Sequence, residues 1–155
     1  MKMKLPPNII ITSLSGFCVC YYKDAAHDPR APLHYHISIP LKENDYFLFV
    51  LITSQLDSKI DYYSRANKKA LNSIISINPH KDFSFIYKDD TVIDCNQPIF
   101  NRKQEFFENN RIINWENDFE IKSRDIPQDL KKRIVSALKD SPIVKPYIKN
   151  LILDV

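Results

Sequence analysis

The stretch that decides the fold is Leu33-His34-Tyr35-His36-Ile37-Ser38-Ile39-Pro40, followed after a break by Tyr46-Phe47-Leu48-Phe49-Val50-Leu51-Ile52-Thr53-Ser54. Both segments are rich in residues that favour extended structure, and the polar break at 42–45 is typical of a turn. The sequence therefore predicts an antiparallel hairpin. Its second strand is apolar on both faces, which indicates a strand buried on both sides.

This hairpin also carries the best indication of chemistry. Antiparallel pairing would bring the start of the first strand, with His34 and His36, beside Thr53 and Ser54 at the end of the second. The two histidines are two positions apart, so on a strand they share one face. Imidazole titrates near neutrality and hydroxyl groups bind or position a phosphate. The sequence thus predicts a polar site at one end of the hairpin.

The remaining pattern indicates a β-rich body at about 15–100 and a helical tail at about 125–153, which together we expect to form one domain over 1–155. An apolar stripe at Ile126, Leu130, Ile134 and Leu138 predicts a helix, and Ser141-Pro142 begins another. In the body we expect a strand at 17–22, loops at 23–32 and 55–60, a short helix within 61–75, a second hairpin of 83–87 and 91–95, and a helical turn at 101–108.

Composition excludes several classes of protein. The chain has 155 residues, of which 44% are hydrophobic and 26% charged, a typical globular composition. One glycine, Gly16, leaves no room for a Gly-rich phosphate loop, and three cysteines without ligand spacing indicate buried reduced thiols, not a zinc site. The net charge of +3 permits an anionic partner. The apolar run at 9–11 is too short for a signal peptide or a membrane span, so we expect a cytoplasmic protein.

One reading of the hairpin rests on His36-Ile37-Ser38-Ile39, which matches the His-apolar-Ser/Thr-apolar unit of the two-histidine phosphoesterases. That chemistry needs two such units, one imidazole acting as acid and the other as base. The sequence has no second unit, since the remaining histidines, His27 and His80, are followed by polar residues. This reading stays as the weaker alternative.

A second reading uses the order of short motifs from Arg30 to Gln97. Arg30-Ala31-Pro32 precedes a strand, a later strand ends in Ile52-Thr53-Ser54, and Asp94-Cys95-Asn96-Gln97 precedes the last helices. This order resembles the PemK/MazF-like small-barrel toxins over roughly 17–138. The chain departs from that family where Ala31 separates Arg30 from Pro32 and where 61–75 is longer than the family loop.

The resemblance implies a small, strongly bent antiparallel sheet or SH3-like barrel with C-terminal helices, hence an α+β fold. It implies a metal-independent endoribonuclease toxin that cleaves single-stranded RNA, needs no cofactor, forms a homodimer and is blocked by an antitoxin protein.

The residues themselves suggest the roles that such cleavage requires. We expect the catalytic group to be Arg30 as phosphate clamp, His34 and His36 as acid or base, and Thr53 as positioning donor. The substrate-binding residues are then Ser54, Asn96 and Gln97, the last two through side-chain amides that read a base edge. Structural roles remain open for each of them, and a non-catalytic barrel that binds protein or RNA in a defence or regulatory operon is the alternative function.

Overall fold

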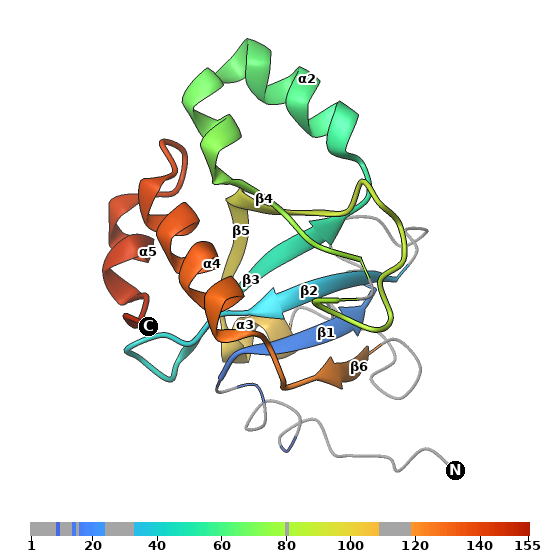
Figure 1. Cartoon of the computed structure of the whole chain (residues 1–155). Coiled ribbons are helices and arrows are strands. Elements are labelled where there is room, and N and C mark those ends of the chain that lie inside the picture. Colours follow the sequence, from blue (N-terminus) through green and yellow to red (C-terminus); the bar gives the residue numbers. More distant parts are fainter. Residues whose placement is uncertain (1–8, 10–13, 15, 24–32, 80, 109–118) are drawn as a thin grey trace.

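The computed structural model describes residues 9, 14, 16–23, 33–79, 81–108 and 119–155. Within them, six strands form one antiparallel sheet in the order β4-β5-β3-β2-β1-β6 (Figure 1). The strands are β1 Cys18–Tyr22, β2 His34–Ser38, β3 Tyr46–Thr53, β4 Ile74–Ser76, β5 Val92–Arg102 and β6 Phe119–Ser123. The helices are α2 Leu56–Ala66, the 3-10 helix η1 Lys68–Ser73, α3 Lys103–Glu108, α4 Gln128–Asp140 and α5 Pro146–Leu151.

The predicted hairpin is confirmed as β2 and β3, paired with Tyr35 opposite Ile52 and Ser38 opposite Phe49. The α+β class, the antiparallel sheet and the C-terminal helices are confirmed as well. The sheet of the described residues is neither closed nor strongly curled, with β4 and β6 at its two edges. It therefore differs from the predicted strongly bent sheet or SH3-like barrel, because β1 continues outward to β6 and does not return toward β5.

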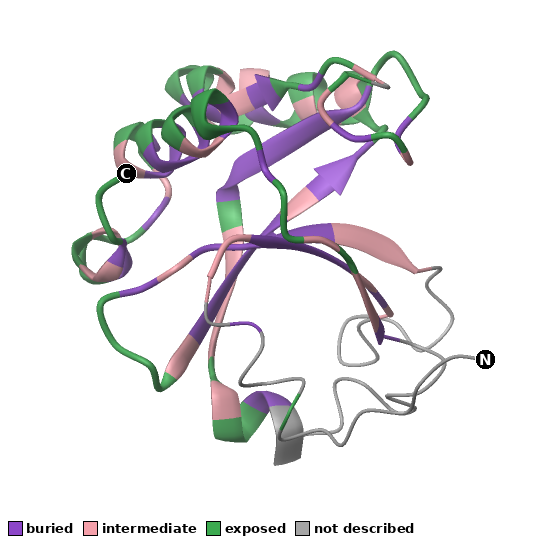
Figure 2. Cartoon of the chain, turned by 60° about the horizontal axis from the view of Figure 1, so that its bottom comes forward, coloured by how far each residue is buried: buried purple, intermediate pink, exposed green. Residues whose placement is uncertain are grey.

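The two faces of the sheet bury different kinds of residue. One face carries aliphatic residues such as Ile37, Val50 and Ile93, and the helical tail packs on it through Ile134 and Leu138. The other face carries an aromatic cluster with two cysteines, made of Leu14, Cys18, Cys20, Tyr22, Phe47, Phe49, Phe106 and Phe119. Figure 2 shows the buried residues along the strands and the inner side of α4. The two-residue alternation of a strand separates these two sets.

The tail agrees with its apolar stripe, since Ile126, Leu130, Ile134 and Leu138 are all buried. The following helix, α5, begins at Pro146 and not at the predicted Ser141-Pro142; its Ile148 is buried and its Tyr147 is exposed. No helix among the described ranges is long enough and apolar enough to cross a membrane.

The body departs from prediction in three places. Residues 83–87 form turns and a single bridge, not a strand, and the rings of Phe83 and Phe85 stack with centroids 5.5 Å apart. The predicted second hairpin is therefore wrong, because β5 pairs with β3 and β4. Residues 56–60, expected in a loop, begin α2, and β6 was not predicted.

Candidate functional site

A cavity of about 340 Å³ lies at the end of the hairpin that the sequence marked as polar. His34, Thr53 and Ser54 all line it, which brings three of the predicted site residues together. Its other lining residues are Tyr21, Leu33, Tyr35, Ile52, Gln55, Phe85, Ile86, Tyr87, Lys88 and Thr91. The volume lies at the small end of the range of small-molecule sites.

Stacked aromatic rings form one wall of this cavity. Tyr21 and Tyr35 stack with centroids 4.4 Å apart, and Phe85 continues the column 5.0 Å from Tyr35. The ammonium group of Lys122 lies over the ring of Tyr21, 5.6 Å from its centroid. Tyr87 is 67% exposed beside the same cavity. Planar aromatic faces with nearby cations are the features on which unpaired bases stack.

The turn that leads from β3 into α2 also lines the cavity. Thr53 ends the strand, and its hydroxyl accepts a hydrogen bond from the backbone N–H of Gln55 at 3.1 Å. That bond is typical of a hydroxyl-stabilised turn. Ser54 is exposed at the rim and Leu56 begins the helix directly after Gln55. The local structure thus presents the side chain of Ser54 to the cavity.

His36 lies away from this cavity although it shares a strand face with His34. Its side chain is 4% exposed and stacks on Tyr22 with centroids 4.0 Å apart and planes 19° from parallel. Its Nδ1 lies 3.1 Å from the backbone oxygen of His34. The aromatic cluster covers the middle of β2 and leaves the first residue of the strand at the cavity. The two histidines therefore have different surroundings.

Asn96 and Gln97 are not among the residues that line the cavity. Asn96 is 1% exposed, and its side-chain amide donates to the backbone oxygen of Ala70 at 2.8 Å. Its Oδ1 accepts from the hydroxyl of Ser141 at 2.8 Å. Gln97 is exposed on β5. Arg30, His27 and His80 lie outside the described residues, so their predicted roles stay predictions.

Sequence reasoning missed a buried polar network beside this site. Asp94 is 3% exposed and lies within reach of Tyr63 and Lys59 of α2. Burial and the nearby Asp94 carboxylate raise the pKa of Tyr63, so its hydroxyl stays protonated and donates. The alternation of Asp94 with apolar neighbours was the available signal, but it does not say which helix would reach it.

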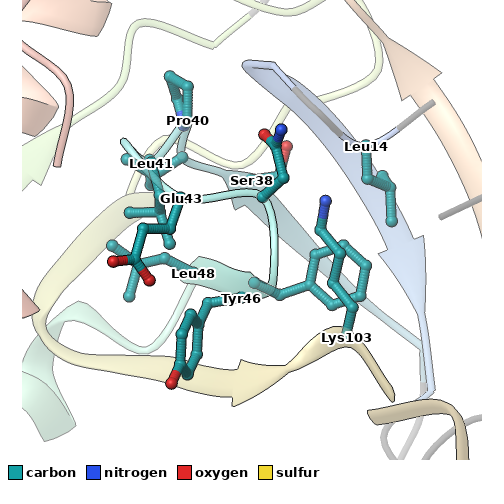
Figure 3. Close-up of a pocket in the computed structure, with 11 residues that line it drawn as sticks. Leu14, Ser38, Pro40, Leu41, Glu43, Tyr46, Leu48 and Lys103 are labelled. Atoms are coloured by element: carbon teal, nitrogen blue, oxygen red, sulfur yellow. The ribbon is translucent and has the colours of Figure 1, made fainter. Parts of the chain in front are cut away.

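A second, smaller hollow lies at the other end of the hairpin (Figure 3). Pro40, Leu41 and Glu43 border it on one side, and Leu14 and Lys103 on the other. Its volume of about 10 Å³ is room for about one water molecule. It is too small for a substrate.

The cysteines match the prediction of buried thiols, since Cys18, Cys20 and Cys95 are free and buried. In the described part of the chain no group of three or more His, Cys, Asp or Glu side chains is placed to hold a metal ion.

Comparisons with protein-family models, with curated proteins and with solved structures give no match for this chain.

Proposed function

We propose that the chain is a metal-independent endoribonuclease that binds single-stranded RNA in the cavity where β2 begins and β3 ends. The observation that carries this proposal is the cavity itself, where His34 and two hydroxyl residues lie beside the column of Tyr21, Tyr35 and Phe85. Aromatic faces bind unpaired bases at about 1–3 kcal/mol per base, and Lys88 at the same cavity supplies a positive charge for the phosphate.

The proposed reaction uses the 2′-hydroxyl of the RNA as nucleophile. His34 takes the proton of that hydroxyl while the 2′-oxygen attacks phosphorus and the bond to the 5′-oxygen breaks. The leaving 5′-oxygen takes a proton from Lys88 or from solvent. Ser54 and Lys88 stabilise the charge that develops on phosphorus. The products carry a 2′,3′-cyclic phosphate and a 5′-hydroxyl.

The test is incubation of the purified chain with a labelled single-stranded RNA in excess EDTA, with analysis of the product ends. We expect cleavage in EDTA and cyclic-phosphate ends. The matched control is the same sequence as DNA, which lacks the 2′-hydroxyl and should bind without being cut. Loss of all cleavage in EDTA, or equal cleavage of the DNA, contradicts the proposal.

Cellular expectations follow from the same proposal. A toxin of this kind should arrest bacterial growth on induction, and a protein encoded next to it should relieve the arrest as an antitoxin. A homodimer belongs to the proposal too, and sedimentation of the purified chain tests it. These expectations come from the resemblance to PemK/MazF-like toxins, whose closed barrel the described sheet does not reproduce.

The second candidate is an RNA-binding module without cleavage. It is favoured by the burial of His36 against Tyr22, which leaves His34 as the one imidazole at the cavity among the described residues. Efficient cleavage needs an acid as well as a base. Binding of the RNA by the wild-type chain with intact RNA after prolonged incubation would establish this module in place of the nuclease.

A further inference from the structure

α2 follows directly from the wall of the cavity, yet little of it is buried. Of its 11 residues, Tyr63 is the buried one, and Ile60 and Tyr62 are exposed. The side chain of Gln55 at its N-terminal boundary makes no capping hydrogen bond. Most helices in proteins are held by an apolar face. The position of α2, and of Ser54 and Gln55 before it, needs another explanation.

Two polar contacts to one oxygen atom of Asp94 explain the position of α2. The hydroxyl of Tyr63 donates to Oδ2 of Asp94 at 2.7 Å. The ammonium group of Lys59, one helical turn earlier, lies 3.2 Å from the same Oδ2. Asp94 is in β5, where it lies opposite Leu51 of β3 on one side and Ile74 of the edge strand β4 on the other. Hydrogen bonds to a buried charged group contribute more to stability than those between neutral groups.

The other oxygen of Asp94 is held just as firmly. Its Oδ1 accepts from the backbone N–H of Asn96 at 3.0 Å and from the side-chain amide of Asn96 at 3.2 Å. The carboxylate is thus fixed in orientation by β5, with Oδ2 directed to α2. Asp94 does not line the cavity and is 3% exposed, so it is placed to act on structure and not on substrate.

We propose that Asp94 is a positioning residue that holds α2 on the sheet and thereby fixes Ser54 and Gln55 in the wall of the cavity. The use of that wall for RNA rests on the proposed function. The position of α2 itself does not.

Hydrogen exchange of backbone amides tests the anchoring without any ligand. In Asp94→Asn, a side-chain NH2 group that takes the place of Oδ2 faces two other donors, the hydroxyl of Tyr63 and the ammonium group of Lys59. In Tyr63→Phe, the hydroxyl that donates to Asp94 is lost, and the shape of the side chain changes little. We expect the backbone amides of 56–66 to exchange at least about tenfold faster in both variants. The exchange rates of the amides of 130–138 in α4 should change far less. Tyr63→Phe supplies the answer if Asp94→Asn does not fold.

The matched control is Ser141→Ala, which cuts the network on the opposite side of Asn96, at the start of the segment leading to α5. It should destabilise the chain without selectively accelerating exchange in α2. Equal acceleration of α2 and α4 in Tyr63→Phe, or unchanged exchange in α2, would overturn the proposal.

A second readout uses a fluorescent single-stranded RNA octamer. We expect Tyr63→Phe to weaken its binding several-fold, and Ser141→Ala to leave binding unchanged at a temperature where both variants are fully folded. If the wild-type chain does not bind the octamer, the proposed function fails and the exchange data alone decide the role of Asp94. If Tyr63→Phe releases α2 but binds RNA normally, the link to the cavity wall is wrong.

Discussion

His36 lies face to face with Tyr22, with ring centroids 4.0 Å apart, and Tyr22 in turn meets Phe49 edge to face at 5.5 Å. His34, two residues earlier on the same face of β2, lines the cavity instead. One strand therefore carries one histidine in the core and one at the cavity. The two histidines can be separated by experiment for this reason.

We predict that His34→Gln abolishes RNA cleavage with little loss of stability, because His34 lies at the strand end. His36→Gln should instead lower the free energy of unfolding by about 1–3 kcal/mol, because a buried ring contact is lost. Urea unfolding and EDTA-resistant cleavage, measured on both variants, check this. Full cleavage by His34→Gln would remove this residue from the mechanism.

The hydroxyl of Ser141 supports a second prediction, on stability. It is fully buried, donates to Oδ1 of Asn96, and accepts from the backbone N–H groups of Ile143 and Val144 at 3.2 and 3.4 Å. Ser141→Ala leaves these groups without a partner, so we expect a loss of about 1–3 kcal/mol in urea unfolding. Ser136→Ala, at an exposed position of α4, is the matched control and should change stability by no more than about 0.5 kcal/mol.

The thiol pair of β1 predicts a pH dependence of stability. Hydrogen bonding to Cys20, opposed by burial and supported by Ser38, lowers the pKa of Cys18 from 9.0 to about 7. The pKa values of Cys20 and Cys95 are raised, so the stability that these thiols contribute is present below the ordinary thiol pKa and is lost as the pH rises past it. Between pH 7 and 9 the unfolded chain holds a proton on Cys18 that the folded chain has released. The stability contributed by Cys18 therefore rises with pH across this window and is lost as the pH falls through 7.

Urea unfolding in the presence of a reductant, at pH 6.5 to 9, measures this effect. The rise attributable to Cys18 should be on the order of 2 kcal/mol, because the pKa of this thiol falls from 9.0 to about 7 and each pH unit contributes about 1.4 kcal/mol. Cys18→Ser should flatten the curve in this range, whereas Cys95→Ser should leave its slope unchanged below about pH 8, where the unfolded thiol is still protonated. An identical slope in wild type and Cys18→Ser would show that Cys18 keeps its proton.

The hairpin and α4 could be predicted because their signals are local. Alternation in β2 and the four-residue spacing from Leu130 to Leu138 each identify an element and its buried side. The partners of β5 could not be predicted from the sequence. Ile93 pairs with Ile52 and with Ile75, and both lie far from it in the chain. Residues 83–87 were also mispredicted, because their alternating aromatic residues indicate a strand. In the structure the rings of Phe83 and Phe85 stack in a turn instead.

The residues of the candidate site that could be predicted are likewise those placed by local pairing. Local pairing brought His34, Thr53 and Ser54 together, as the hairpin register requires. Burial of His36 depends on the rings of Tyr22 and Phe49 that pack against it, and no local sequence pattern reports that contact. Asn96, predicted to read a base edge, lies within β5, where its side chain bonds Ala70 of η1 and Ser141.

Tyr87 gives the sharpest test of the cavity as a site for an unpaired base. It is 67% exposed at the cavity, so Tyr87→Ala should change the free energy of unfolding by no more than about 0.5 kcal/mol. Loss of one aromatic face should weaken binding of a single-stranded RNA octamer by about 1–3 kcal/mol, or roughly 5- to 150-fold. The matched control is Tyr62→Ala, a 53% exposed tyrosine of α2 outside the cavity lining, which should bind RNA as the wild type does. Equal affinity of wild type and Tyr87→Ala would exclude this ring from RNA binding, and equal weakening by both variants would place the RNA elsewhere on the surface.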